Sequence, residues 1–193
     1  MVDAVWIGGV HAVGKSTIIK GADLLGRDVV SVSKEMVRYA NQYGITNDML
    51  NRLPYDERAR VGDETFKAIA RANRKVIVDS HYTILIMDGT MPRSWEMGIP
   101  DWLAKNHITG YLLVEAAPEQ VLARRVADHS DAGERRSKDL AVVEYELHME
   151  RRAAEYYSNA AGLQLHVIQN TGSVEQAQRE FSDALRSVES KIK

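Results

Sequence analysis

A glycine-bracketed segment near the N-terminus, GVHAVGKST, has the residue types of a phosphate-binding loop. It begins at Gly9, ends at Thr17, and lies between an apolar run and an amphipathic segment. Its two glycines, lysine and hydroxyl match the Walker A pattern GxxxxGK[ST] in full. Glycines let successive backbone N–H groups turn toward phosphate oxygens, and a helix N-terminus adds positive potential. The segment therefore predicts a site for a nucleoside triphosphate.

The whole loop is predicted to cradle the phosphates, with ATP and Mg²⁺ as the cofactors. Lys15 is expected to reach the β- and γ-phosphates, and the Ser16 hydroxyl is expected to be the metal ligand. The predicted nucleotide-contacting residues of the loop are Gly9, Val10, His11, Ala12, Val13, Gly14, Lys15, Ser16 and Thr17.

His11 and Ala12 are the two loop residues whose types need separate interpretation. A protonated His11 ring could donate to a phosphate oxygen, since its ordinary pKa is near 6.5. Lys15 and Mg²⁺ already supply that charge, so we expect only the His11 backbone to matter, with the ring capping the loop or facing solvent. Ala12 stands inside the loop at a position where glycine would be more permissive, and it fits there if its φ is negative.

Two polar side chains, Asp79 and His81, end the apolar run KVIVDSHYT. In open parallel sheets, ligands gather outside the carboxyl ends of the strands, beside the phosphate loop. Asp79 is predicted to orient the hydration shell of Mg²⁺ or to bond Ser16; its alternative role is that of a turn or cap residue. His81 either contacts the acceptor or braces the following loop.

Apolar runs alternate with amphipathic segments along the chain, which is typical of a mostly parallel sheet covered by helices. A polar stretch at about 128–139 reads as a short lid, and 81–102, with two glycines and two prolines, reads as a long loop. The predicted strands are 4–8, 29–33, 76–80, 110–115 and 163–169, and the predicted helices are 15–25, 34–42, 54–72, 118–128, 139–161 and 173–191.

Composition indicates one α/β domain over residues 1–193 and excludes several classes of protein. A net charge of −2 and the lack of a basic stripe interleaved with aromatics argue against a nucleic-acid partner. Without cysteine there are no disulfides and no thiolate metal sites. No apolar run reaches the roughly 18 residues of a membrane span, and the N-terminus does not resemble a signal peptide. We therefore expect a cytoplasmic protein with no membrane partner.

The order of several motifs resembles that of archaeal-type adenylate kinases. The motifs are the phosphate loop, VIVDSHYTI, GIPDWL, GYLLVEA, ARRV and VIQN, and they extend over residues 5–170. Because the phosphate loop is common to many proteins, DSHYTI and IQN carry the specificity. The resemblance implies a P-loop NTPase fold with a five-stranded parallel sheet of order 2-3-1-4-5 and helices on both faces. It also implies phosphoryl transfer from MgATP to AMP, and a homo-trimer.

Arginines beyond the fourth predicted strand match those that the resemblance places around ATP. Arg125 looks like the arginine that stacks on adenine, while Arg135 and Arg136 look like lid arginines that clamp the phosphates. Phosphoryl transfer needs such positive charge to close over the migrating group. Arg151 and Arg152 either serve the same clamp or belong to a solvated helix face. The predicted catalytic set is Lys15, Asp79, Arg125, Arg135 and Arg136.

Residues 33–72 lie where monophosphate kinases hold the acceptor nucleotide. Arg38 and Arg52 are candidates for its phosphate, since a guanidinium fork binds phosphate with two hydrogen bonds. For both, the alternative is a surface ion pair. Ser33 is predicted to contact the base or ribose, and His81 completes the predicted acceptor site.

Two further stretches bear on nucleotide specificity. Asn170, at the end of VIQN, is predicted to help frame the adenine, the alternative being a simple strand-end turn. The stretch LIMDGTMPRSWEMGIP departs from the proline- and glycine-rich sequence usual in the resembled family. Trp95 and Met97 in it either pack under the loop or line a pocket for another acceptor.

The sequence thus predicts an ATP-dependent kinase whose small acceptor is AMP. One alternative is a kinase for another nucleotide or a small metabolite, which the altered stretch favours. A second alternative, from a different class, is a nucleotide-binding switch or assembly ATPase. The arginine-rich lid, and the lack of a water-positioning glutamine after the third predicted strand, count against the switch.

Overall fold

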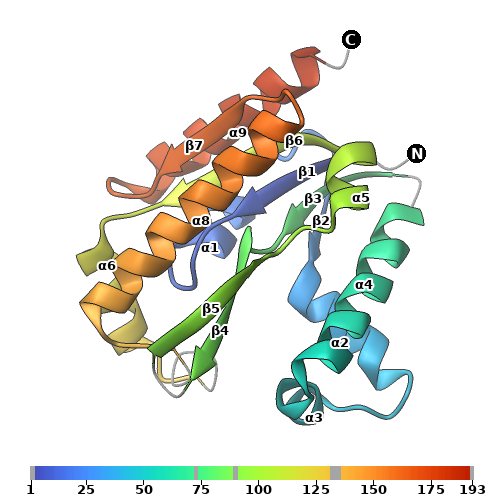
Figure 1. Ribbon diagram of the computed structural model, residues 1–193. Coiled ribbons are helices and arrows are strands. Elements are labelled where there is room, and N and C mark those ends of the chain that lie inside the picture. The colour runs from blue at the N-terminus through green and yellow to red at the C-terminus, as the bar shows by residue number, and fades with distance from the viewer. Residues whose placement is uncertain (1–2, 72–73, 89–90, 131–135, 192–193) are drawn as a thin grey trace.

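The computed structural model describes residues 3–71, 74–88, 91–130 and 136–191. At its centre is a parallel five-stranded sheet of order β2-β3-β1-β6-β7 (Figure 1). Counting only these strands in chain order gives 2-3-1-4-5, so the predicted fold is confirmed. The strands are β1 (Asp3–Gly8), β2 (Asp28–Ser31), β3 (Lys75–Asp79), β6 (Ile108–Glu115) and β7 (Leu165–Gln169).

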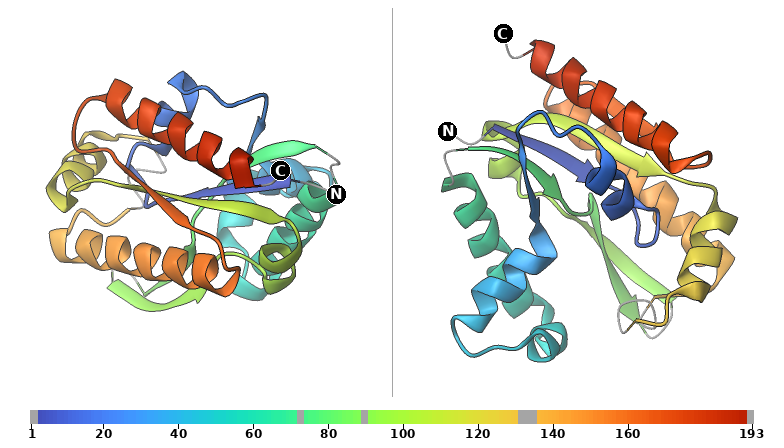
Figure 2. Two further views of the ribbon diagram at one scale, coloured as in Figure 1. Left: turned by 90° about the horizontal axis from the view of Figure 1, so that it is seen from above. Right: turned by 180° about the vertical axis from the view of Figure 1, so that it is seen from behind.

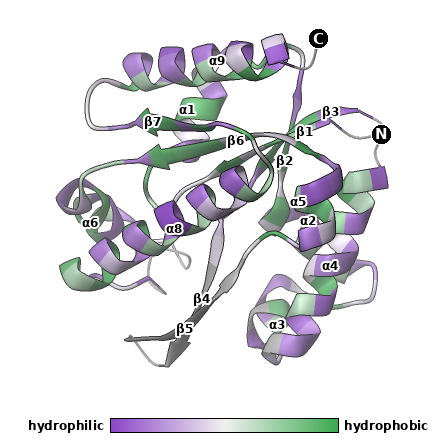
Figure 3. Cartoon of the chain, turned by 45° about the horizontal axis from the view of Figure 1, so that its top comes forward, coloured by the Kyte–Doolittle hydropathy of each residue, from purple (hydrophilic) through white to green (hydrophobic). Residues whose placement is uncertain are grey.

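Helices cover both faces of this sheet. The helices are α1 (Lys15–Gly21), α2 (Val32–Asn41), α3 (Asn47–Arg52), α4 (Tyr55–Arg71), α5 (Asp101–Asn106), α6 (Pro118–Ala127), α8 (Leu140–Ala160) and α9 (Val174–Lys191). Figure 2 shows α9 and α8 on opposite faces. Successive strand residues point to opposite faces, so Val5 and Ile7 pack with α1 and α9, while Ala4 and Trp6 pack with α4 and α8. This double burial explains the near-continuous apolar strands (Figure 3).

The stretch predicted as a long loop, 81–102, is largely regular structure. It contains the antiparallel hairpin of β4 (Thr83–Asp88) and β5 (Met91–Met97), followed by α5. The prediction of a loop was wrong, because glycine and proline also occur in the turns of hairpins and at the start of helices. Asp88–Gly89 between two runs rich in apolar residues is a hairpin signal, and Pro100 immediately precedes α5.

Two other boundaries differ from the prediction. The helix α1 stops at Gly21 rather than at residue 25, because Ala22 is extended and the Asp23 carboxylate accepts a hydrogen bond from the Leu25 amide. The short helix α3 was not predicted; the Thr46 hydroxyl caps it by accepting from the Met49 amide at 3.3 Å. The remaining predicted elements agree with the structure within one or two residues.

Candidate active site

The phosphate loop joins β1 to α1, and its backbone follows a path that requires glycine at both ends. Gly9 has φ +142° and Gly14 has φ +104°, backbone angles that residues other than glycine rarely adopt. A Cβ at Gly14 would also lie 2.2 Å from Asn170 Nδ2. Val10 and Val13 are buried and anchor the loop to the core. The two glycines and the two buried valines therefore define the backbone path of the loop.

Ala12 also adopts a left-handed conformation, with φ +67°. The condition under which Ala12 would fit the loop without strain, a negative φ, is therefore not met. A non-glycine residue in this region costs about 1–2 kcal/mol because its Cβ approaches the neighbouring carbonyl. The surrounding contacts hold the strained residue in place, and one of them is the hydrogen bond of 3.4 Å from Arg124 Nη1 to the Ala12 carbonyl.

The carbonyl of Val13 is held from outside the loop by two side chains. Asn170 donates from Nδ2 at 2.7 Å, and Arg124 donates from Nη1 at 2.9 Å. Asn170 is itself fixed by a backbone hydrogen bond of 2.7 Å to the carbonyl of Glu115 at the end of β6. The structure thus places Asn170 as a support of the phosphate loop, at the edge where three strands end.

Lys15 opens α1 and lies among groups of opposite charge. Its ammonium donates to the carbonyl of Gly9 at the other end of the loop. Burial lowers the pKa of Lys15, whereas the carboxylates of Asp79 and Glu150 oppose that change. Ser16 and Thr17, the next residues of the helix, are exposed. The arrangement offers one cation and two accessible hydroxyls beside a rigid loop.

Asp79 is the last residue of β3 and His81 follows the strand, as predicted, and both lie beside the phosphate loop. Asp79 is level with Ile7 of β1 and with Ser31 of β2 in the sheet register. Burial raises the pKa of Asp79, and the charges of Lys15 and Lys34 act against that rise. Burial and the charges of Lys15 and Arg136 lower the pKa of His81 well below 6.5, although part of its ring remains exposed. His81 is therefore a neutral hydrogen-bonding group at physiological pH.

Arg125 lies in the interior, against the expectation that it stacks on an adenine. Its side chain is fully buried and forms an ion pair with Glu146 of α8. The same guanidinium donates to the carbonyls of His11 and Ser137, each at 3.3 Å. Through these contacts Arg125 joins the phosphate loop to the segment before α8.

His11 contacts the segment that follows α6. Its Nε2 lies 3.3 Å from Asp128 Oδ2. Burial and the charge of Arg136 lower the pKa of His11, so a neutral ring donates through Nε2 to the carboxylate. The ring therefore connects the phosphate loop to the start of the predicted lid.

Of the two predicted lid arginines, Arg136 lies among the described residues. Arg136 is exposed, and its charge lowers the pKa of His11, Lys15 and His81, which places it within electrostatic reach of the phosphate loop. Arg135 lies outside the described residues. Arg151, the secondary candidate, forms a two-pronged ion pair with Glu115 at the end of β6.

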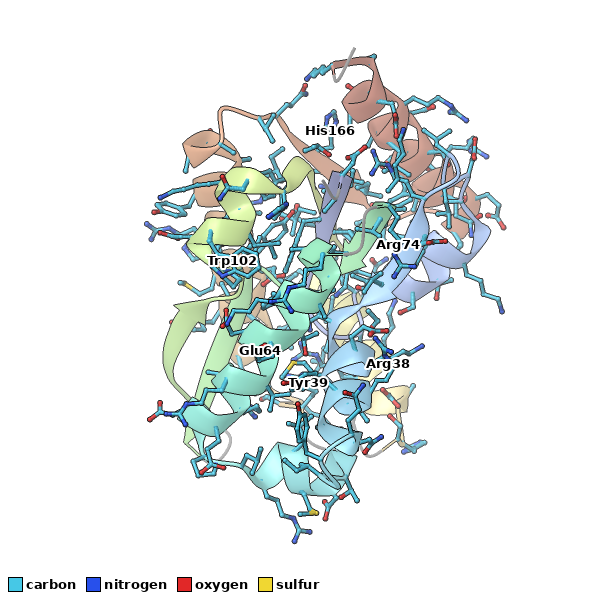
Figure 4. All side chains as sticks on the ribbon, turned by 90° about the vertical axis from the view of Figure 1, so that its right-hand side faces the viewer. Arg38, Tyr39, Glu64, Arg74, Trp102 and His166 are labelled. Carbon is cyan, nitrogen blue, oxygen red and sulfur yellow. The ribbon has the colours of Figure 1, made fainter. Side chains whose placement is uncertain are left out.

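The acceptor-side arginines pair within their own helices. Arg38 bonds Glu35 and leaves 68% of its side chain exposed, and Arg52 bonds Asp48 with 78% exposed. Figure 4 shows Arg38 on the outer side of α2. Ser33 Oγ lies 3.2 Å from Ser31 Oγ. Neither arginine contacts Asp79 or Lys15 among the interactions of the described residues, so the structure does not bring them to the phosphate loop.

The sequence analysis missed several residues of the site, among them one lysine and two glutamates. Lys34, in the first turn of α2, acts electrostatically on Asp79. Glu146 and Glu150 are buried on the inner face of α8. A signal for the two glutamates was present: they fall at helical spacing on the same stripe as Val143 and Ala154, where apolar residues are expected.

Comparison with known proteins agrees with this geometry. A family model described as AAA domain matches residues 8–144. An adenylate kinase of Methanopyrus kandleri is 30% identical over 93% of this chain and 96% of its own length. An adenylate kinase of Pyrobaculum aerophilum is 31% identical over 84% of this chain and 82% of its own length.

Solved structures with the same fold include kinases of low sequence identity. Shikimate kinase from Bacteroides thetaiotaomicron has a TM-score of 0.59 at 11% identity, covering 95% of this chain and 98% of its own. A gluconokinase from Sinorhizobium meliloti has a TM-score of 0.57 at 13% identity, covering 98% and 95%. Among the described residues, none of the helices has the length and apolar character needed to cross a bilayer. With this fold, this phosphate loop and these relatives, the chain belongs to the adenylate kinase family and is a P-loop nucleoside monophosphate kinase.

Proposed function

We propose that the enzyme transfers the γ-phosphoryl group of ATP to AMP and so forms two molecules of ADP. The observation that carries this proposal is the near full-length similarity to archaeal adenylate kinases, combined with a phosphate loop held rigidly at the edge of the sheet. The donor nucleotide binds the loop from Gly9 to Thr17, and the acceptor lies on the side of α2, β3 and the β4–β5 hairpin.

The residues beside the loop supply charge where the transfer needs it. Lys15 neutralises the β- and γ-phosphates, and it exchanges its hydrogen bond with the Gly9 carbonyl for phosphate oxygens. Arg136 acts from the lid side, and the resemblance assigns Arg135 to the same role. No covalent intermediate is required, since catalysis comes from positioning and electrostatic stabilisation.

Magnesium fits the donor set at this site. Among the described residues, no group of three or more histidines, aspartates or glutamates could hold a metal by itself. Mg²⁺ commonly takes one or two protein ligands and completes its shell with phosphate oxygens and water. The exposed Ser16 hydroxyl would be the direct ligand, and Asp79 would orient the bound water. The ion would neutralise charge that develops on the phosphates.

The hairpin favours one alternative acceptor class. The sequence of the β4–β5 hairpin departs from the proline- and glycine-rich stretch usual in the resembled family, so another nucleoside monophosphate or a small metabolite is the second candidate.

An acceptor scan with MgATP separates these candidates. We expect AMP to give ADP far above the background of ATP hydrolysis, and to do so with a higher kcat/KM than CMP, GMP, UMP, shikimate or gluconate. A Lys15→Ala variant should lose most of the turnover while remaining folded. A higher kcat/KM for another acceptor would replace AMP in the proposal, and ATP hydrolysis indifferent to every acceptor would refute transfer.

A sedimentation measurement would test the trimer that the resemblance implies.

A further inference from the structure

The carboxylate of Glu150 receives four hydrogen bonds in the interior of the protein. Its Oε1 accepts from the amides of Gly9 and Tyr82, both at 2.8 Å. Its Oε2 accepts from the amide of Thr83 at 3.0 Å and from the Thr83 hydroxyl at 2.8 Å. The residue is only 2% exposed. One side chain of α8 therefore binds two segments that are far apart in the sequence.

These two segments belong to opposite sides of the reaction. Gly9 is the first residue of the phosphate loop, which holds the donor. Tyr82 and Thr83 lead from β3 into β4, the first strand of the acceptor-side hairpin. His81 Nδ1 lies 3.9 Å from Glu150 Oε1, and the charge of Glu150 also acts on Lys15. The buried carboxylate thus binds both the donor loop and the start of the acceptor-side strand β4, and its charge acts on the catalytic lysine.

Placing a carboxylate at this buried position costs free energy. Removing its charge from water is unfavourable, and the four donors offset that penalty. Among the described residues, no lysine or arginine donates a hydrogen bond to it, so its partners are the backbone and one hydroxyl. Each oxygen accepts from two donors, and the carboxylate plane therefore fixes the relative position of Gly9 and Thr83.

We propose that Glu150 is a positioning residue of the phosphoryl transfer, which holds the phosphate loop and the start of the acceptor hairpin at a fixed separation. The proposal rests on the proposed function for its acceptor side. It concerns the alignment of the two substrates, so its loss should appear in kcat more than in the KM for MgATP, because the donor still binds the remaining amides of the loop.

Thr83 offers a mild test of this junction. Thr83→Val keeps the shape of the side chain but removes the hydroxyl donor, whereas Thr83→Ser keeps the donor. We expect Thr83→Val to lower kcat by roughly tenfold, the lower end of the range for one lost hydrogen bond to a charged group, and Thr83→Ser to stay near the parent. Equal kcat values in parent, Thr83→Ser and Thr83→Val would overturn the proposal.

Glu150→Gln tests the carboxylate itself. Its amide nitrogen would face backbone N–H donors on one side, so at least one donor loses its acceptor. We expect a fall in kcat of about tenfold or more, and a combined effect with Thr83→Val smaller than the product of the single effects. Glu155→Gln, on the exposed face of the same helix, is the matched control and should keep the parental kcat. A loss of thermal stability with unchanged kcat would assign Glu150 a structural role only.

Hydrogen exchange of the backbone amides tests the role of Glu150 in a way that does not depend on which acceptor the enzyme uses. In the parent, MgATP alone should increase protection of the Tyr82 and Thr83 amides, since the bound loop is coupled to them through Glu150. The increase should be lost in Glu150→Gln and retained in Glu155→Gln. If AMP proves not to be the acceptor, this readout still tests the junction. Parental protection in Glu150→Gln would refute the coupling.

Discussion

Arg125 and Glu146 form an ion pair in the interior, with side-chain exposures of 0% and 7%. Breaking such a pair leaves an uncompensated buried charge, which typically costs about 3–5 kcal/mol. We predict that Glu146→Ala lowers the free energy of unfolding by this amount, measured by urea denaturation.

A matched control and a rescue make this prediction specific. Arg186→Ala, which removes an exposed ion pair with Asp23 and Asp183, should change stability by about 1 kcal/mol at most. Replacing both buried partners, as Arg125→Met with Glu146→Leu, should recover part of the loss, because neither charge then remains buried. A Glu146→Ala protein as stable as the parent would contradict the assignment.

For the strained Ala12 of the phosphate loop we predict a substitution that raises the free energy of unfolding instead of lowering it. Ala12 has φ +67°, so Ala12→Gly should relieve steric strain and stabilise the protein by up to about 1 kcal/mol after the greater chain entropy of glycine is subtracted. Ala123→Gly, at an exposed position inside α6, should instead destabilise it by about 1 kcal/mol. Thermal unfolding of both variants checks the signs, and equal destabilisation would contradict the strain.

The sequence predicted the parts of the site that depend on local pattern. The Walker A spacing located the phosphate loop, the alternation of apolar runs indicated the strands, and the resemblance implied their order. Asp79 lies where it was expected, because the carboxyl end of a strand beside the loop is defined by topology.

Other parts depend on contacts between distant segments, which no local pattern contains. Arg125 belongs to a helix end rich in charge, yet its partner Glu146 is buried on another helix. Glu150 binds residues 68 and 141 positions away. Arg38 and Arg52 suited a phosphate by residue type, and only the structure shows that each is paired within its own helix.

The acceptor side yields a direct comparison of two cations. Lys34 acts electrostatically on Asp79, whereas Arg38 is paired with Glu35. We predict that Lys34→Ala raises the KM for the acceptor about tenfold, the size of a lost charge-assisted contact, and that Arg38→Ala raises it far less. Steady-state kinetics with saturating MgATP measure both. A larger effect of Arg38→Ala would restore the assignment made from the sequence.

The folded protein holds His81 in a state that depends on pH. Burial, together with Lys15 and Arg136, lowers the folded pKa of His81 well below 6.5, so the unfolded chain binds more protons between the two pKa values. Stability contributed by this residue is therefore complete above the unfolded pKa and falls as the pH decreases below about 6.5. His81→Gln should flatten the dependence of the urea midpoint on pH between 7 and 5. The raised pKa values of Asp79 and Glu150 act in the opposite direction in both proteins, so the comparison isolates the histidine. An identical slope in the two proteins would show that His81 titrates in the folded state as it does in the unfolded chain.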